Sequence, residues 1–232
     1  GPDGEPLAPG HPVRPSLDDV REVPTIRMPY GQEVPLTYCP AGVRRMSKLA
    51  YLLAWTFSEH QAESSRMGQR VSNQIIVLVD EPETHLPPRW QRNVLASIQA
   101  AVQAWHDDAK PEVQLIVATH SPLILASAEP RFDPQVDALW KLELVGKEVT
   151  FEREEVWHPR GDINRWLVSD VFDLGAPTSR ETEQVLGRAK ALLSARNGSD
   201  AEVRDVDAEL ARLLPEMDPF FIRWRHYFGS RI

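Results

Sequence analysis

The chain has 232 residues, of which 42% are apolar, and this is enough for one domain of good size with an appendage. Its formal net charge of −8 argues against a protein whose whole surface binds nucleic acid, although it does not exclude a local basic site. The single cysteine, Cys39, cannot form an internal disulfide, and no apolar run approaches the roughly 20 residues of a membrane span. We therefore expect no membrane contact and a cytoplasmic location.

Proline and glycine are frequent in residues 1–28, where apolar residues are few. This composition predicts a linker or an extended arm rather than a helix. The sequence opens on Gly1-Pro2 without an initiator methionine, and we interpret it as the carboxyl-terminal portion of a longer protein. Three parts are expected: this arm in 1–28, an α/β lobe in 29–160 and a helical appendage in 161–232.

A turn and a buried helix are predicted after the arm. Apolar residues in 43–57 recur at helical spacing and form one face of a helix. Ala41 and Gly42 stand at its start, and Arg44 and Arg45 follow within the first turn. In the plainest interpretation these two arginines are solvated residues of a core helix, since most arginines are exposed without a further role.

Residues 75–79 are five consecutive apolar residues, four of them β-branched, and they predict a strand buried on both faces in a parallel sheet. The strand ends in Asp80 and Glu81, and a turn follows at Pro82. Ligands of open α/β sheets usually bind at the carboxyl ends of strands. Alternation along an extended chain would point the two carboxylates in opposite directions, so that one could hold Mg²⁺ while the other orients water.

A second apolar strand, residues 115–118, is followed closely by His120. Between the two strands, Pro87-Pro88 suits the first turn of a helix, and apolar residues then recur at helical spacing. Strand, helix and strand form a right-handed crossover unit with parallel strands. The two strand ends would therefore lie side by side, and His120 would face the acidic pair.

Residues 138–144 alternate between apolar and polar side chains, and a turn at Gly146 leads into a second such run at 149–153. This pattern predicts a hairpin at the edge of the sheet.

The appendage is predicted to contain a hairpin of two antiparallel helices. Residues 178–181 and 199–202 both fit the capping-box pattern that begins a helix, and a stripe of apolar residues follows each. Asp205 and Asp207 lie inside the second helical pattern, which favours a solvated helix face over a metal-binding Asp-x-Asp motif. Aromatic and basic residues interleave in 220–228 and could contact nucleic acid, but their helical spacing favours packing against the core.

The runs Val79–Leu86 (V-D-E-P-E-T-H-L) and Ala118–Pro122 (A-T-H-S-P) carry a family resemblance. Together, at this spacing, they resemble the Walker B, D-loop and switch-histidine segments of ABC-type ATPases in the SMC-like and RecF-like branch. The resemblance is closest to bacterial AAA-family ATPases with an Asp-Glu-Pro-Glu-x-His-Leu motif, many of which lie in defence gene clusters. Each run alone is common, whereas the two together around a crossover helix are specific.

The resemblance implies ATP hydrolysis with Mg²⁺ across a head-to-head homodimer. By this resemblance Asp80 would hold Mg²⁺ through water, Glu81 would orient or deprotonate the attacking water, and His120 would contact the γ-phosphate. Glu83 and His85 would lie on the D-loop, near the partner subunit.

The same resemblance assigns a signature-like, nucleotide-binding role to the start of the helix near residue 41. Ala41, Gly42, Arg44 and Arg45 would bind the γ-phosphate held by the opposite subunit, because helix N-termini suit anions. Pro40 departs from the family pattern, which usually has a serine there, so one hydroxyl donor to the phosphate is missing.

None of the twelve glycines belongs to a Gly-x-x-x-x-Gly-Lys-Ser/Thr phosphate loop (Walker A), which the resemblance places in an amino-terminal half. We therefore expect an α/β chain: the carboxyl-terminal lobe of an ABC-type nucleotide-binding domain, with a parallel sheet core and an α-helical hairpin appendage. It would need the Walker A half or a partner chain to hydrolyse ATP.

The process that ATP hydrolysis serves could be phage defence or DNA maintenance, with nucleic acid or an effector protein as a further partner. The alternative is a non-catalytic interaction module, which Pro40 favours.

Overall fold

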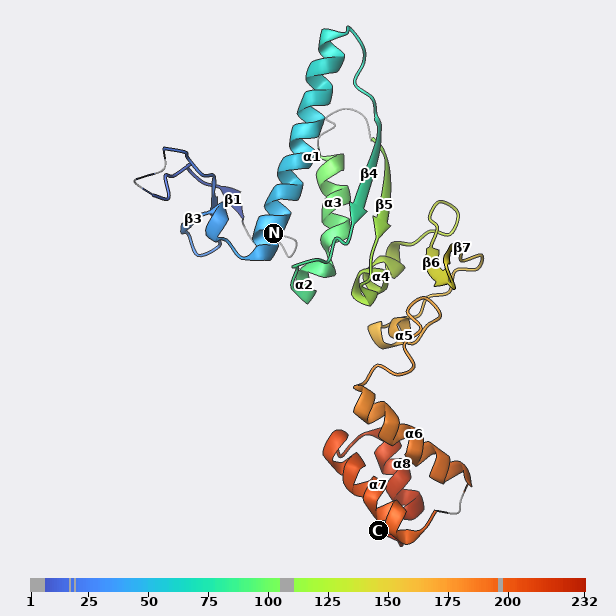
Figure 1. Ribbon diagram of the computed structural model, residues 1–232. Helices are drawn as coiled ribbons and strands as arrows, with labels where there is room; N and C mark the ends of the chain where they lie inside the picture. The colour runs from blue at the N-terminus through green and yellow to red at the C-terminus, as the bar shows by residue number, and fades with distance from the viewer. Residues whose placement is uncertain (1–6, 17, 19, 105–110, 196–197) are drawn as a thin grey trace. The chain divides into compact units, whose positions relative to one another are not determined.

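The computed structural model describes residues 7–16, 18, 20–104, 111–195 and 198–232 (Figure 1). The chain divides into two compact units, Gly1–Gly161 and Asp162–Ile232. Among the described residues, no helix is long and apolar enough to cross a bilayer.

A small antiparallel sheet opens the first unit, in the order β1 (Ala8–Pro9), β2 (Thr25–Arg27) and β3 (Glu33–Pro35). The segment expected to be a linker or extended arm is thus extended but paired. The Glu33 carboxylate accepts hydrogen bonds from the Arg27 guanidinium at 2.8 Å and from the His11 backbone N–H at 3.0 Å. These two donors lower the pKa of Glu33 to about 2, so its carboxylate stays ionised in mild acid, where an ordinary glutamate takes up a proton.

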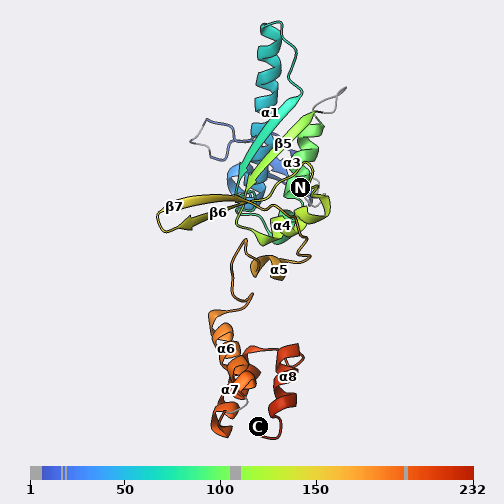
Figure 2. The same ribbon diagram turned by 90° about the vertical axis from the view of Figure 1, so that its right-hand side faces the viewer.

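A 3₁₀ turn, η1 (Leu36–Tyr38), leads into the long helix α1 (Ala41–Arg66). Two parallel strands, β4 (Gln74–Asp80) and β5 (Glu112–Ala118), follow, and α2 (Pro88–Gln91) and α3 (Val94–Gln103) connect them. The pairing register runs from Gln74 opposite Glu112 to Asp80 opposite Ala118. The predicted strand–helix–strand unit with a parallel sheet is confirmed, and its two strands end at the same level (Figures 1 and 2).

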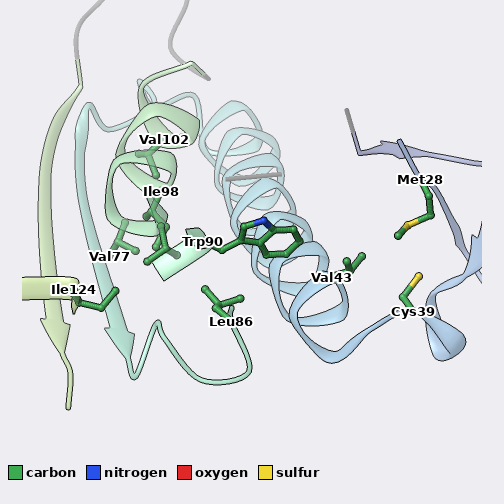
Figure 3. Packing of buried hydrophobic residues seen from close by; sticks show 10 residues of the cluster. Met28, Cys39, Val43, Val77, Leu86, Trp90, Ile98, Val102 and Ile124 are labelled. Carbon is green, nitrogen blue, oxygen red and sulfur yellow. The ribbon is translucent and has the colours of Figure 1, made fainter. Parts of the chain in front are cut away.

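The core of the first unit lies between the parallel sheet, α3 and α1. Figure 3 shows Val77 of β4 facing Ile98 and Val102 of α3, with Trp90 of α2 lying next to α1. The cluster extends through Val43 of α1 to Cys39 and to Met28, which follows β2. Its buried members are Met28, Cys39, Val43, Val77, Leu86, Trp90, Val94, Ile98, Val102 and Ile124.

The other face of the β4–β5 sheet is open in this chain. Ile76 and Leu78 of β4 are 63% and 76% exposed, and their neighbour Ile116 of β5 is 47% exposed. The prediction that the first strand is buried on both faces is therefore wrong for this chain, because α1 and α3 pack on one side of the sheet. We call Ile76, Leu78 and Ile116 the open face.

After β5 come α4 (Pro122–Ala128) and η2 (Glu129–Arg131), and then the hairpin β6 (Trp140–Val145) and β7 (Glu148–Arg153). The hairpin itself is confirmed, and Trp140 stacks on Phe151 across it with ring centroids 4.4 Å apart. Its predicted position is wrong, because β6 and β7 form a two-stranded sheet of their own rather than the edge of the β4–β5 sheet.

The second unit contains α5 (Ile163–Leu167), α6 (Arg180–Ala195), α7 (Asp200–Leu213) and α8 (Pro219–Phe228). Helices α6 and α7 follow the predicted apolar stripes, and α8 packs on both of them as a third helix rather than leaving a two-helix hairpin. The predicted packing of Trp224 and Phe228 is confirmed, since both are buried. The buried core consists of Val185, Ala189, Leu192, Val203, Val206, Leu210, Phe221, Trp224 and Phe228.

Asp207 corrects the expectation of a solvated acidic pair on α7. Asp205 is exposed as predicted, but Asp207 is buried between α7 and α8. Its Oδ1 accepts hydrogen bonds from Trp224 Nε1 at 3.2 Å and from Arg225 Nε at 3.3 Å. A buried carboxylate needs such partners, because burying it unpaired costs several kcal/mol, of the order of 3–5.

We expect helices α6–α8 of the second unit, called the helical unit below, to be dispensable for the folding of the first unit, because each of the two has its own apolar core. A chain ending at Asp170 should keep the melting temperature and the β-sheet circular dichroism of the first unit. The matched fragment 176–232 should be helical by itself. If the shortened chain is unfolded while fragment 176–232 folds, the first unit depends on the second and the division is wrong.

Candidate active site

Asp80 and Glu81 lie at the carboxyl end of β4. The Glu81 N–H donates to the carbonyl of Ala118 on β5 at 2.8 Å, so the ladder continues one residue past the strand. Glu81 itself has a φ of +46°, a left-handed conformation that costs a non-glycine residue about 1–3 kcal/mol and occurs often at functional sites. The expectation that Asp80 and Glu81 point in opposite directions assumed an extended chain, and Glu81 is not extended.

A tight turn supports the Glu81 side chain. The Thr84 N–H donates to the Glu81 carbonyl at 3.1 Å, and the Thr84 hydroxyl donates to Glu81 Oε2 at 3.0 Å. The second carboxylate oxygen, Oε1, lies 4.0 Å from Nε2 of His120. The structure thus brings His120 beside Glu81, as the crossover unit predicts.

His120 stands on the loop after β5 and its side chain is 89% exposed, whereas the Glu81 side chain is 50% exposed. Both groups are therefore accessible to a ligand at the carboxyl edge of the sheet. The Asp80 carboxylate is also exposed and makes no hydrogen bond with the described residues. An accessible acid, a second acid and an imidazole meet at this edge, which can bind a metal–phosphate ligand and handle a proton.

Glu83 lies close to the same edge, and its carboxylate bonds to the loop after β5. Its Oε2 accepts a hydrogen bond from the Thr119 hydroxyl at 2.8 Å, and its Oε1 accepts one from the His120 N–H at 2.8 Å. Glu83 therefore joins the turn after β4 to the loop after β5. Sequence reasoning placed Glu83 next to a partner subunit and missed Thr119, although its position directly before His120 was a usable signal.

Arg45 makes a contact that the sequence did not predict. Its Nη2 donates to the Asp80 carbonyl at 3.1 Å and to the Glu81 carbonyl at 2.6 Å, so it is not merely a solvated arginine. Arg44 donates to the Thr37 carbonyl at 3.1 Å. The two bonds from Arg45 hold the start of α1 against the end of β4. Hydrogen bonds from a charged donor are roughly twice as strong as neutral ones.

Gly42 has a packing role at the same contact. A Cβ on Gly42 would lie 2.9 Å from the carbonyl oxygen of His85, a residue that itself has a φ of +64°. Only glycine fits at this approach without a shift of the backbone. A pocket of about 780 Å³ lies beside this contact. Its lining includes Ala41, Arg44, Arg45, Lys48, Pro82 and His85.

The predicted residues thus form two neighbouring groups. Asp80, Glu81 and His120 meet at the carboxyl edge of the sheet. Ala41, Arg44, Arg45 and His85 line the pocket at the start of α1. Arg45 connects the groups through its bonds to the two carbonyls.

Residues 26–126, which contain every residue of both groups, match a family model described as "AAA domain, putative AbiEii toxin, Type IV TA system". Two curated relatives point the same way. The chain is 25% identical over 158 residues to "Retron Ec83 probable ATPase" of Escherichia coli, a match that covers 68% of this chain and 26% of the relative. These matches support an ATPase domain of the AAA/ABC-like kind.

The second relative is "Retron Vc95 probable ATPase" of Vibrio cholerae serotype O1 biovar El Tor. It is 36% identical over 52 residues, or 22% of this chain and 9% of the relative. The chain thus spans 26% of the length of the first relative and 9% of the length of the second. The segment that matches the AAA-domain model, residues 26–126 (called the AAA-type segment below), runs from β2 into α4 and includes the parallel sheet.

A domain of this kind implies a nucleotide and usually Mg²⁺. Among the described residues, no group of three or more His, Cys, Asp and Glu side chains is placed to hold a metal ion. Mg²⁺ in nucleotide sites is usually bound through one or two carboxylates together with phosphate oxygens and water. The exposed carboxylate of Asp80 can provide one such protein ligand to an ion that is otherwise bound by phosphate oxygens and water. It could not hold a metal ion without those other ligands.

Proposed function

We propose that this chain supplies the hydrolytic part of an ATPase site. One observation carries the proposal: Glu81 and His120, from the ends of two parallel strands in the AAA-type segment, lie 4.0 Å apart beside the exposed Asp80. A carboxylate at hydrogen-bonding reach of water, next to a metal ligand and a phosphate-binding imidazole, is what hydrolysis of a phosphoanhydride requires.

In this proposal each residue has one task. Asp80 would hold Mg²⁺ through water, and the ion would supply positive charge beside the phosphates. Glu81 orients the attacking water and accepts its proton, and the bond from Thr84 keeps its carboxylate in place. His120 donates a hydrogen bond to the γ-phosphate. Arg45 keeps the backbone of the acidic pair in position through the two carbonyls.

A second segment would complete the site by supplying the phosphate loop, from the same polypeptide or from a partner chain. Two observations support this. The open face of the sheet leaves large apolar side chains exposed, and burying an isoleucine or leucine side chain stabilises by about 1.5–3 kcal/mol. The chain also spans only 26% of the length of a relative named as an ATPase.

The head-to-head dimer belongs to the same proposal. Ala41, Gly42 and Arg44 at the start of α1 would receive the γ-phosphate of the opposite subunit, and His85 would lie near them. The pocket at this place has three cationic side chains on its wall, which suits an anion. Since the names of both relatives read "probable ATPase" of a retron, we further propose that hydrolysis serves a retron-like defence system.

Pro40 favours the alternative function, a non-catalytic interaction module. Pro40 caps α1 and makes no side-chain hydrogen bond there, so the hydroxyl expected of a signature-like loop is missing. In that case the AAA-type segment would only bind a partner, and turnover would not depend on the acidic pair.

The isolated chain should bind MgATP weakly or not at all, because its sequence has no phosphate loop to hold the triphosphate. Calorimetry on this chain, alone and joined to its phosphate-loop segment, measures the difference. In the joined protein Asp80→Ala should weaken Mg²⁺-dependent binding roughly 10- to 100-fold. Asp205→Ala, which removes an exposed carboxylate of α7, is the matched control.

Two outcomes would count against the proposal. Low-micromolar MgATP binding by the isolated chain would mean that it has its own phosphate site. Unchanged nucleotide binding and turnover in the joined Asp80→Ala protein would favour the interaction module instead.

A further inference from the structure

We propose that Glu83 is a positioning residue, which holds the loop after β5 so that His120 stays beside Glu81. The inference rests on the proposed function, because it assigns Glu83 to the same ATPase site. It adds to the sequence-based expectation, in which Glu83 lies on the D-loop near the partner subunit.

Both carboxylate oxygens of Glu83 are used within the chain. Oε2 accepts from the Thr119 hydroxyl and Oε1 accepts from the His120 N–H, each at 2.8 Å. Hydrogen bonds to an ionised carboxylate are short and roughly twice as strong as neutral ones. Two such bonds to adjacent residues fix both the position and the orientation of the loop.

These bonds belong to a closed ring that joins the two strand ends. The Thr119 hydroxyl accepts from the Ser121 N–H at 3.0 Å, and the Ser121 hydroxyl donates to Gln91 Oε1 at 2.9 Å. Gln91 Nε2 donates to the Leu86 carbonyl at 3.0 Å. The Leu86 N–H donates to the Glu83 carbonyl at 2.9 Å, which closes the ring.

The ring matters because packing does not hold the histidine. The His120 side chain is 89% exposed, so few side-chain contacts restrain it. Its backbone N–H, bonded to Glu83, is the anchor nearest to the imidazole. Without that bond the backbone of His120 loses its own attachment to the turn after β4, and the separation of His120 from Glu81 is less firmly fixed.

The consequence should be a loss of rate rather than of nucleotide binding. Misplacing a catalytic group by about 1 Å can lower a rate by on the order of 10²-fold. In the ATPase joined to its phosphate-loop segment, Glu83→Ala should lower kcat by that order with little change in KM. Glu83→Gln should lose less, since its amide oxygen can still accept the His120 N–H. Glu148→Ala, on the exposed strand β7, is the control.

The decisive measurement is a double-mutant cycle with His120→Ala. If Glu83 acts through His120, adding Glu83→Ala to His120→Ala should cost little further activity, because residues that act as a unit are not additive. The inference would be overturned if the double variant lost kcat by the product of the two single-variant factors, or if the Glu83→Ala enzyme had the wild-type kcat.

A second variant pair covers the case in which Glu83→Ala does not fold. Thr119→Val removes the hydroxyl with little change in shape, whereas Thr119→Ser keeps it. Thr119→Val should lose more kcat than Thr119→Ser, and its loss should also vanish in the His120→Ala background; equal losses would contradict the inference. Glu81→Gln separates this result from the proposed function. If Glu81→Gln is inactive and the Glu83 and Thr119 variants are fully active, only the positioning role is wrong.

Discussion

Glu81→Gln should lower ATP hydrolysis by about 10²- to 10⁴-fold in the protein joined to its phosphate-loop segment, because a positioned general base contributes a factor of that size. Glutamine keeps the shape of the side chain and can still bond with the Thr84 hydroxyl, so the turn after β4 should survive. It lacks the negative charge and the basicity. Turnover measured beside nucleotide binding tests this expectation.

Nucleotide binding should persist in Glu81→Gln, since Asp80 and the phosphate loop are untouched. In the proposed head-to-head dimer, ATP would then accumulate between the subunits, and the dimer population measured by light scattering should rise with MgATP. His120→Ala should slow turnover with a smaller loss of affinity. Glu148→Gln, which makes the same change at an exposed glutamate of β7, provides a matched control. A Glu81→Gln protein that hydrolyses ATP at the wild-type rate would remove Glu81 from the catalytic role.

Trp224→Ala should unfold most of the helical unit. The indole is fully buried among α6, α7 and α8, and truncating a buried tryptophan costs about 3–5 kcal/mol. The change also removes the Nε1 donor of buried Asp207, which keeps its bonds to Arg225, and a hydrogen bond to a charged group contributes about 1.5–3 kcal/mol. The sum is comparable to the whole stability of a small domain, about 5–15 kcal/mol.

Urea unfolding of fragment 176–232, followed by circular dichroism at 222 nm, measures the effect. The matched control is Ile222→Ala on the same helix, whose side chain is 49% exposed and whose loss should change stability by about 0.5 kcal/mol or less. A loss below about 1 kcal/mol for Trp224→Ala would mean that α8 is not part of the core.

The parallel unit was predictable because its signals are local. Four β-branched residues among five apolar ones favour a strand, and Pro87-Pro88 favours a helix start before the next strand. These preferences act within a few residues of the chain. The meeting of His120 with the acidic pair then follows from topology, since parallel strands joined by a crossover end at the same edge.

The loops at that edge were less predictable. The left-handed conformation of Glu81 depends on its bond to Ala118 and on the turn closed by Thr84. The two bonds from Arg45 to backbone carbonyls join residues that are 35 and 36 positions apart. A sequence pattern reports which residues are charged, but it does not report which distant carbonyl a guanidinium reaches.

Similar reasoning explains the hairpin and Asp207. Alternation predicted both strands of β6–β7, yet alternation does not specify the sheet to which a hairpin belongs. Asp207 was expected in solvent because its polarity matches a helix surface. It is buried because α8 brings Trp224 and Arg225 against it, and both donate to its carboxylate.

The sequence by itself determined the strand–helix–strand order of the parallel unit, the parallel pairing of β4 and β5, and the acidic pair and histidine at their ends. These follow from hydrophobic period, turn residues and the handedness of crossovers, which are properties of short segments. Only the tertiary structure decided that one face of the sheet stays open, that Glu83 bonds the loop of His120, and that a third helix completes the second unit. Each of these depends on contacts between residues far apart in the chain, which short-range preferences do not specify.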